Sequence, residues 1–567
     1  MTPQPHTRTL TIIAQDPGVK IDNKILTAEV RVPAEVLYPG PRGYRVQVID
    51  YDASTDTLYA PLRYPPSVRG QYLDPFRKAS DDELISNPQF HAQNVYAIVM
   101  RTLARFEFAL GRRVGWSFAG HQIMVAPHAF ADANAFYSER DRALMFGYFP
   151  ALDGRGTVFS CLSHDVVAHE TTHALVDGLR TYFTDPSSPE QAGFHEGFSD
   201  VVALLSVFSL TGVVAALLDV DSADSKRIER TKLTRGRLRQ SVLLGLAEQM
   251  GEEMSRLRGQ ALRRSVALKR SSSIMESEEF QEPHRRGEIL VAAMLNAFIE
   301  VWIMRLKGLG DKTTQLLDRK RVAEEGADAA SHLLTMAIRA LDYTPPTDLE
   351  FCDFLSALLS ADMELVPDDS KYGYRAILRE SFSAYGIEPS AVGSAEGYWK
   401  RPDCALDYTR THFVAMQRDP DEIFRFLWEN RTALGLNEDA YTSVNAVRPC
   451  LRIGPDGFVL HETIADYVQI VTLRATELRR RGIEIPAGMP DQKEVTIYGG
   501  GALVFDEYGQ LKYHVSNRVL DAERQSRRLR YLWRYGYFHP AFSELRRFSS
   551  LHRRRARDQR TLHSEVW

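Results

Sequence analysis

Apolar and polar positions alternate in the first part of the chain, and helical spacing replaces this alternation further on. Residues 1–75 contain stretches such as RTLTIIA and YRVQVIDYD between Pro and Gly residues, a pattern that predicts β-strands joined by turns. From about Asn87 the apolar residues recur at helical intervals, and Gly111 with its basic neighbours is expected to end that helix. Strand-like pieces return over residues 114–159, and nearly every segment of 166–385 has helical spacing.

A cluster of Gly, Ser and Pro at residues 389–402 indicates a linker that separates the last part of the chain from the rest. Beyond it, PDEIFRFLWENRTALG predicts a helix, and VTIYGGGALVFDEYGQLKYHVS predicts a hairpin whose turn lies at Glu507-Tyr508-Gly509. The sequence therefore predicts an α+β fold in four parts: a β-rich region at 1–80, a main domain at 81–388, the linker, and an α+β module with a basic tail at 403–567.

The composition is that of an ordinary soluble globular protein. The chain has 567 residues, 44% of them hydrophobic and 25% charged, a length that predicts several domains. Its formal charge of -4 gives no reason to expect nucleic acid as a partner. Residues 226–270 and the last 47 residues are rich in basic side chains, and we expect both to be solvated surfaces. Four widely spaced cysteines fit a reducing compartment better than a disulfide framework: Cys161, Cys352, Cys404 and Cys450.

One uncharged stretch, Val201 to Leu218, has 18 residues and is just long enough to cross a bilayer. Asp200 and Asp219 bound it closely, polar residues interrupt it and no basic flank follows, so we expect a buried core helix instead. The first residues lack the charged and apolar regions of a secretory signal. These features predict a cytoplasmic protein with no membrane segment, and they leave signal-independent export open.

The candidate chemistry begins with His169-Glu170-Thr-Thr-His173, an HExxH motif on a helical pattern. Residues four positions apart share one face of a helix, so both imidazoles can reach a single zinc ion. Glu170 lies beside that face, where its carboxylate can take a proton from a metal-bound water. The metzincin arrangement is excluded, because Val176 and Leu179 stand where it requires Gly and His.

A third ligand is needed, and two glutamates follow at a useful distance. Glu196 is preferred, because Asp200 lies one turn further along the same face and can accept the second ring N–H of a ligand histidine. Glu190 is the alternative, but it lies in the stretch DPSSPEQ and has no such companion.

These motifs resemble those of the thermolysin-like zinc metallopeptidases. DVVAHETTHALVD is similar to that family's zinc-binding motif almost letter for letter, and GFHEGFSD is similar to the motif that supplies its glutamate ligand. Asn134-Ala135-Phe136-Tyr137 resembles the edge strand that binds substrate, and IRALDYTPPTDLEFCDFLSALLSADMEL resembles the end of the helical lobe. The resemblance covers residues 81–388 and implies two lobes, a mixed β lobe and an α-helical lobe, with an active-site helix at 166–179.

The resemblance also implies roles for individual residues. The implied zinc ligands are His169, His173 and Glu196, with Glu170 as the group that activates a water. The other implied roles are the following: Asp200 orients His169, Asp177 supports the active-site helix from behind, Asn134 and Ala135 hold the substrate chain, and Tyr182 and His284 stabilise the oxyanion.

The sequence departs from the family's pattern in several places, among them a longer insertion before His284. The interval between His173 and Glu196 is longer, which indicates an insertion near DPSSPE. His195 stands where the family has Asn in its glutamate motif. Of the acidic residues that would form the family's paired calcium site, Asp165 remains but Val207 occupies a matching position, so calcium is not predicted.

The sequence thus predicts a zinc-dependent endopeptidase that acts on a peptide or protein substrate and binds one catalytic zinc ion. Two alternatives stay open. The chain could be an effector or binding protein that keeps the peptidase fold with its activity gated or lost, or a zinc hydrolase with a substrate other than a peptide. A protein partner or regulator would bind through the N-terminal and C-terminal regions, residues 1–80 and 403–567.

Overall fold

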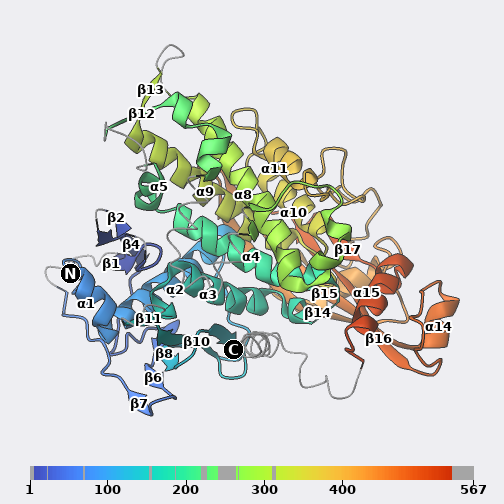
Figure 1. Ribbon diagram of the computed structural model, residues 1–567. Coiled ribbons are helices and arrows are strands. Elements are labelled where there is room, and N and C mark those ends of the chain that lie inside the picture. Colours follow the sequence, from blue (N-terminus) through green and yellow to red (C-terminus); the bar gives the residue numbers. More distant parts are fainter. Residues whose placement is uncertain are drawn as a thin grey trace.

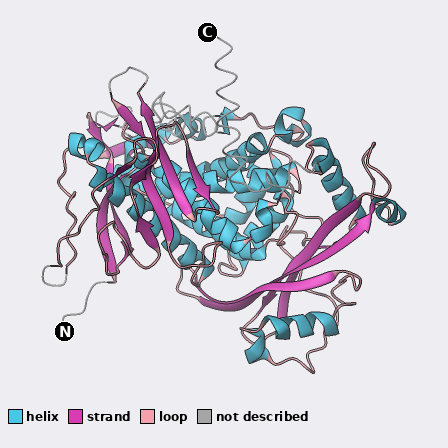
Figure 2. Cartoon of the chain, turned by 90° about the horizontal axis from the view of Figure 1, so that it is seen from below, coloured by secondary structure: helices cyan, strands magenta, loops and turns pink. Residues whose placement is uncertain are grey.

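The computed structural model describes residues 6–18, 20–21, 23–67, 71–151, 156–185, 187–218, 226–240, 264–265, 267–309 and 315–538. Its architecture is mixed α+β with several sheets, which confirms the α+β part of the predicted fold class (Figure 1). Strands lie at two ends of the molecule and the long helices fill the space between them (Figure 2). The candidate site lies among these central helices.

The N-terminal strands pack on the first long helix, α2 (Pro88–Leu110). Strand β1 (Thr7–Ile13) pairs antiparallel with β4 (Thr27–Pro33), and the amide of Ile13 donates to Asn94 of α2 at 2.9 Å. Helix α2 follows the expected pattern and ends at Gly111, which has a φ of 68°. The remaining short elements before it are β2 (Lys20–Ile21), β3 (Lys24–Ile25), β6 (Tyr51–Asp52), β7 (Thr57–Leu58) and α1 (Asp81–Ser86).

The main sheet of the N-terminal part has the strand order β11-β10-β8-β5. Strand β9 lies off this path and pairs with β10. Its strands are β5 (Val46–Val48), β8 (Ile123–Phe130), β9 (Ala135–Ser138), β10 (Ala143–Pro150) and β11 (Thr157–Phe159). Strand β8 runs parallel to both β5 and β10, so a strand from residues 1–80 lies in the same sheet as strands from 81–388. Within the described residues β9 pairs with β10 alone, which makes it an edge strand.

The central helices pack closely around α4 (Pro189–Phe208), which lies between α3 (His164–Leu179) and α8 (Pro283–Lys307). A Cβ built on Gly197 of α4 would lie 2.7 Å from the carbonyl oxygen of Gly287 in α8, so only glycine allows this approach. The other helices of this group are α5 (Thr211–Leu217), α9 (Arg319–Ala340), α10 (Phe351–Met363) and α11 (Tyr374–Ser383), with 3-10 turns η1 (Ser160–Leu162), η2 (Thr181–Thr184), η4 (Arg230–Lys232), η6 (Ile274–Glu276), η7 (Glu278–Gln281) and η8 (Leu341–Tyr343).

The apolar stretch 201–218 is mostly buried, with Thr211 and Gly212 exposed, but the prediction that it forms one helix is wrong. Helix α4 ends at Phe208 and α5 begins at Thr211, with an angle of 84° between them. The hydroxyl of Ser209 donates to the carbonyl of Ser206 at 2.7 Å and competes with the helical ladder at the break. Among the described residues, α8 is the one helix long and apolar enough to span a membrane, and 78% of its apolar window is buried.

The C-terminal part forms a four-stranded antiparallel sheet in the order β14-β15-β16-β17. Its strands are β14 (Tyr441–Ile453), β15 (Val459–Arg474), β16 (Glu494–Phe505) and β17 (Leu511–Asn517), accompanied by α12 (Phe413–Met416), α13 (Pro420–Glu429), α14 (Ala475–Arg480) and α15 (Ala522–Arg534). The predicted hairpin is confirmed as β16 and β17, and Gly509 in its turn has a φ of 81°. The predicted helix is confirmed as α13.

Buried charges join this sheet to the helices. Arg452 of β14 is fully buried and binds Asp342 of η8 and Glu462 of β15. The sheet also contributes apolar residues to the core that the helices share. Segment 389–402 is packed rather than free, because the indole N–H of Trp399 donates to the carbonyl of Tyr343 at 2.8 Å.

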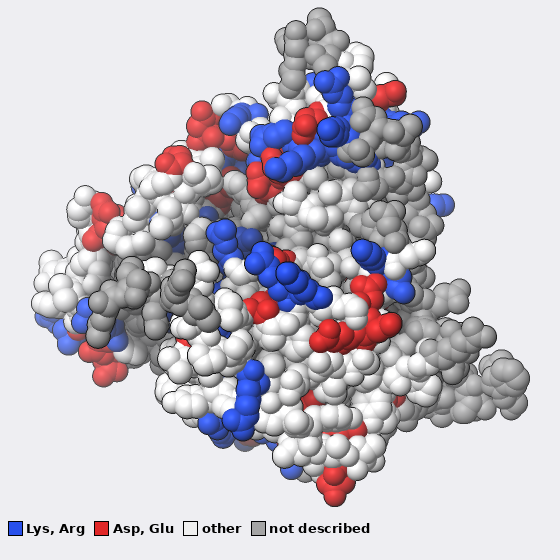
Figure 3. Space-filling model, turned by 90° about the vertical axis from the view of Figure 1, so that its left-hand side faces the viewer, with Lys and Arg blue, Asp and Glu red and all other residues white. Residues whose placement is uncertain are grey.

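Much of the basic section at 226–270, and residues 539–567 of the basic tail, lie outside the described residues. Where 226–270 is described, β12 (Arg227–Glu229) pairs with β13 (Leu316–Asp318), and Arg264 forms an ion pair with Glu288 of α8 at 2.6 Å. On the face shown in Figure 3, basic and acidic side chains lie interspersed.

Candidate metal centre

Helix α3 carries the HExxH motif, and it begins two residues before the predicted start at 166. Its residues are buried along almost the whole length. His169 and His173 lie one turn apart, with ring centroids separated by 4.4 Å and ring planes at 78°. Both rings face α4, so the helical spacing of the motif has placed two imidazoles on one side of one helix.

Helix α4 supplies the third member of the cluster, Glu196. Its carboxylate oxygens lie 3.6 Å from Nε2 of His169 and 3.9 Å from Nε2 of His173. The ligand atoms of all three residues lie within 4.8 Å of one another, and all three residues are buried. Glu196 occupies the eighth position of α4, since this helix begins at Pro189.

A hydrogen-bond partner orients each imidazole from its other side. Nδ1 of His169 lies 2.6 Å from Oδ1 of Asp200, as the sequence predicts. Nδ1 of His173 lies 2.7 Å from Nδ1 of His195 and 3.1 Å from the Ser199 hydroxyl. A ring that donates from Nδ1 keeps its lone pair on Nε2, the atom that faces Glu196. Two imidazoles and one carboxylate with their rings fixed in this way match the ligand set of a catalytic zinc site.

Glu170 is fully buried and is held by the edge strand β9. The backbone N–H of Tyr137 donates to its carboxylate at 2.9 Å. The Tyr137 hydroxyl in turn donates to Asp177 at 2.8 Å, which ties the far end of α3 to the same strand. Burial raises the pKa of Asp177 to about 6, although hydrogen bonds from Tyr137 and Ser117 oppose the rise. Asp177 thus supports α3 from the side of the sheet.

Asn134 and Ala135 lie at the start of β9. The side-chain oxygen of Asn134 accepts the N–H of Ala135 at 2.9 Å, and its carbonyl accepts the N–H of Gly147 at 2.9 Å. Ala135 pairs with Phe146 of β10. The strand is therefore fixed beside Glu170, while a role in holding a substrate chain stays a prediction.

His284 approaches the cluster from the first turn of α8. Its Nε2 lies 3.6 Å from Oε1 of Glu196, and its Nδ1 lies 3.0 Å from Glu282. Glu282 also accepts the N–H of Arg285 at 2.9 Å and so caps α8. The sequence reasoning missed Glu282, although an acidic residue two positions before the histidine is a usable signal.

Tyr182 lies in η2, after the end of α3, and its ring packs 5.8 Å from that of Tyr498 in β16. Burial raises the pKa of Tyr182, and the neighbouring Tyr498 adds to the rise. Among the described residues no direct contact joins Tyr182 to the zinc-ligand candidates, and its role at an oxyanion stays a prediction.

The alternative ligand, Glu190, has a structural environment of its own. It lies in the first turn of α4, not in the preceding turn, and its carboxylate accepts the N–H of Phe351 at 2.7 Å. Burial raises the pKa of Glu190, and Arg286 at 4.0 Å opposes the rise. Glu190 thus joins α4 to α10 and is not a member of the cluster.

Comparisons with known proteins add no family to this geometry. No model of a known protein family matches the chain, and no curated protein matches it.

Proposed function

We propose that the protein is a zinc-dependent endopeptidase with the two-lobed architecture of the thermolysin-like enzymes. The observation that carries the proposal is the convergence of His169, His173 and Glu196 from two helices, with Glu170 next to them. The sheet and α2 would form the mixed β lobe, and the helices from α4 to α11 would form the α-helical lobe.

In this proposal His169, His173 and Glu196 bind the zinc ion, and their buried setting keeps the ligand atoms together. When bound, the ion supplies a polarised water and a Lewis acid for a carbonyl oxygen. Asp200 and His195 fix the tautomers of the two imidazoles, so that each ring presents the lone pair of Nε2.

The remaining residues move or stabilise charge. Glu170 accepts a proton at its carboxylate and returns it to the leaving amine, and the N–H of Tyr137 holds that carboxylate in place. His284 donates from Nε2 to the negative charge that develops on the substrate carbonyl, and Glu282 orients its ring. In this proposal an extended peptide lies along β9, whose strand pairing within the described residues is with β10 alone.

The contact between Tyr182 and Tyr498 favours a second candidate function, an effector or binding protein whose peptidase activity is gated or lost. It places the C-terminal sheet against the segment that follows α3. A protein partner of the C-terminal region could then act on the site through this contact.

Digestion of a denatured protein mixture separates these functions. The endopeptidase should generate new peptide ends that disappear when a chelator is added and return with zinc. Cleavage only after a protein partner is added supports gating. A zinc-loaded chain that cleaves no peptide under any of these conditions excludes the proposed function.

A further inference from the structure

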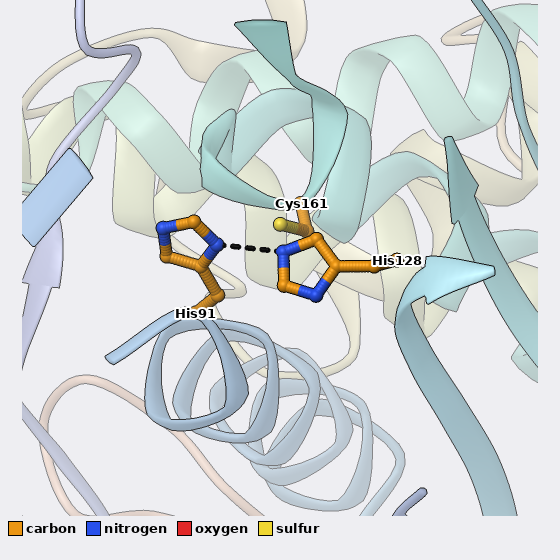
Figure 4. A group of neighbouring side chains, drawn as sticks. All are labelled: His91, His128 and Cys161. Atoms are coloured by element: carbon orange, nitrogen blue, oxygen red, sulfur yellow. Dashed lines mark hydrogen bonds between the residues drawn. The ribbon is translucent and has the colours of Figure 1, made fainter. Parts of the chain in front are cut away.

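A second buried cluster of metal-ligating side chains lies apart from the candidate metal centre. His91 of α2, His128 of β8 and Cys161 of η1 point toward one another (Figure 4). None of the three is more than 2% exposed, and their ligand atoms lie within 4.8 Å of one another. The cluster shares no residue with the site around Glu196, so neither site depends on the function proposed for the other.

The two histidines form the middle of a row of three short polar contacts. Nε2 of His91 lies 2.8 Å from the carbonyl oxygen of Ile85, and Nδ1 of His91 lies 2.8 Å from Nε2 of His128. Nδ1 of His128 lies 2.8 Å from Asp50. The Asp50 carboxylate also accepts the backbone N–H of His128 at 3.1 Å.

The two neutral imidazoles carry too few N–H hydrogens to supply one to each of these three contacts. A carbonyl oxygen only accepts, so Nε2 of His91 carries a hydrogen, and a carboxylate likewise accepts, so Nδ1 of His128 carries a hydrogen toward Asp50. A neutral imidazole has a single N–H, so both rings have used theirs at the outer contacts. Two lone pairs then face each other across 2.8 Å. One additional positive charge must lie between them, either a proton or a metal ion.

We propose that a divalent transition-metal ion of the zinc class binds here, held by Nδ1 of His91, Nε2 of His128 and Sγ of Cys161. The thiol distinguishes the two possibilities. A proton shared by two rings needs no sulfur beside it, whereas a thiolate is a strong ligand for such ions. Water is the usual fourth ligand where the protein supplies three.

Charge and geometry both suit a divalent ion. The Cys161 thiolate and the Asp50 carboxylate carry two negative charges, which balance an ion of charge two in a buried place. Two nitrogens bound to one tetrahedral zinc lie about 3.4 Å apart, so the rings need to separate by only a few tenths of an ångström each. Asp50 and the Ile85 carbonyl already orient the rings as the outer partners of metal-bound histidines do.

The site would act as a clip between three elements of the N-terminal end. It joins α2 to the main sheet through β8, and it fixes η1, which ends two residues before α3 begins. The ring of Phe159 packs on both histidines, with centroids 4.7 Å from His91 and 5.1 Å from His128. The ion would thus stabilise the start of the active-site helix without taking part in catalysis.

Cobalt substitution tests the site without an activity assay. The full-length chain with His173→Ala, which lacks one ligand of the other centre, is stripped of metal and titrated with Co²⁺. A cysteine ligand should give a sulfur-to-cobalt charge-transfer band in the near ultraviolet that saturates at one equivalent. Cys161→Ser in the same background should lose the band. Cys352→Ser is the matched control and should keep it, although Cys352 also lies beside carboxylates.

A second measurement needs no change at the cluster. X-ray absorption of the zinc-loaded His173→Ala chain should show one sulfur and two or more nitrogen or oxygen neighbours around the bound zinc. A folded chain with no charge-transfer band, or zinc surrounded by nitrogen and oxygen alone, would overturn the proposal in favour of the shared proton. Persistence of the band in Cys161→Ser would equally overturn it.

Discussion

Replacing Asp342 with Asn should loosen the C-terminal sheet from the helical core. Asp342 is buried in η8 and accepts two hydrogen bonds from Arg112, at 2.5 and 2.7 Å, and a further one from Arg452 of β14. Burial alone would raise the pKa of Asp342, but the two guanidinium groups outweigh it and hold that pKa well below its usual value. The carboxylate therefore stabilises the folded protein in its ionised form.

The size of the effect follows from the groups that remain. Asparagine keeps the shape of Asp342 but leaves Arg112, whose side chain is 9% exposed, facing a neutral amide, while Arg452 keeps its ion pair with Glu462. An uncompensated charge in such a setting costs about 3–5 kcal/mol. Asp491→Asn is the matched control, because the pair of Asp491 with Arg479 is more than half exposed on both sides and contributes below about 1 kcal/mol.

Urea unfolding followed by tryptophan fluorescence measures the difference, since Trp399 lies at this interface. A group with a lowered folded pKa stabilises the protein above its unfolded pKa, and that contribution disappears as the pH falls toward the folded pKa. The difference in the free energy of unfolding between the wild-type protein and Asp342→Asn should therefore have its full size at pH 7. It should shrink by about 1.4 kcal/mol per unit below about pH 4. A variant that matches Asp491→Asn at pH 7, or a gap independent of pH, refutes this reasoning.

Three further changes test the candidate metal centre. Asp200→Asn should weaken zinc binding about 10- to 100-fold in competition with a chelator, because His169 loses its carboxylate partner; unchanged affinity would show that Asp200 does not orient the ring. His284→Ala should keep zinc and lower kcat by about 10²–10³, and loss of zinc instead would make it a structural residue. Gly197→Ala should destabilise the protein by about 1–3 kcal/mol against Gly287, measured by thermal unfolding, while Gly212→Ala, with open space around it, should not.

The sequence was most informative where one element determines the geometry. His169 and His173 could be placed together from their spacing alone, because an α-helix brings residues four apart onto one face. The turn around Gly509 and the end of α2 at Gly111 were predictable for a similar reason, since both depend on local backbone conformation.

Contacts between elements were harder to predict. The bond between His173 and His195, and the approach of His284 to Glu196, depend on how α3, α4 and α8 pack, which no spacing encodes. The break at Ser209 lies within an uncharged stretch whose few polar residues are also compatible with one continuous helix, so hydropathy gave no sign of it.

The burial of charged residues in the C-terminal sheet could not be predicted from the sequence either. A sequence pattern treats Arg452 and Glu462 as surface positions, yet both are buried because each finds its partners on another element or strand. The parallel pairing of β5 with β8 likewise joins segments far apart in the chain, and it places one strand from residues 1–80 in the sheet of the central part.

Zinc content and peptide cleavage, measured together on Glu170→Gln, test the central claim most directly. The glutamine keeps the hydrogen bond from the Tyr137 N–H and leaves the three ligand candidates intact, but it cannot accept a proton. We predict that the variant binds zinc as tightly as the wild-type chain and loses nearly all zinc-dependent cleavage. Cleavage at the wild-type rate by the zinc-loaded variant would contradict the assignment of Glu170, and with it the proposed endopeptidase.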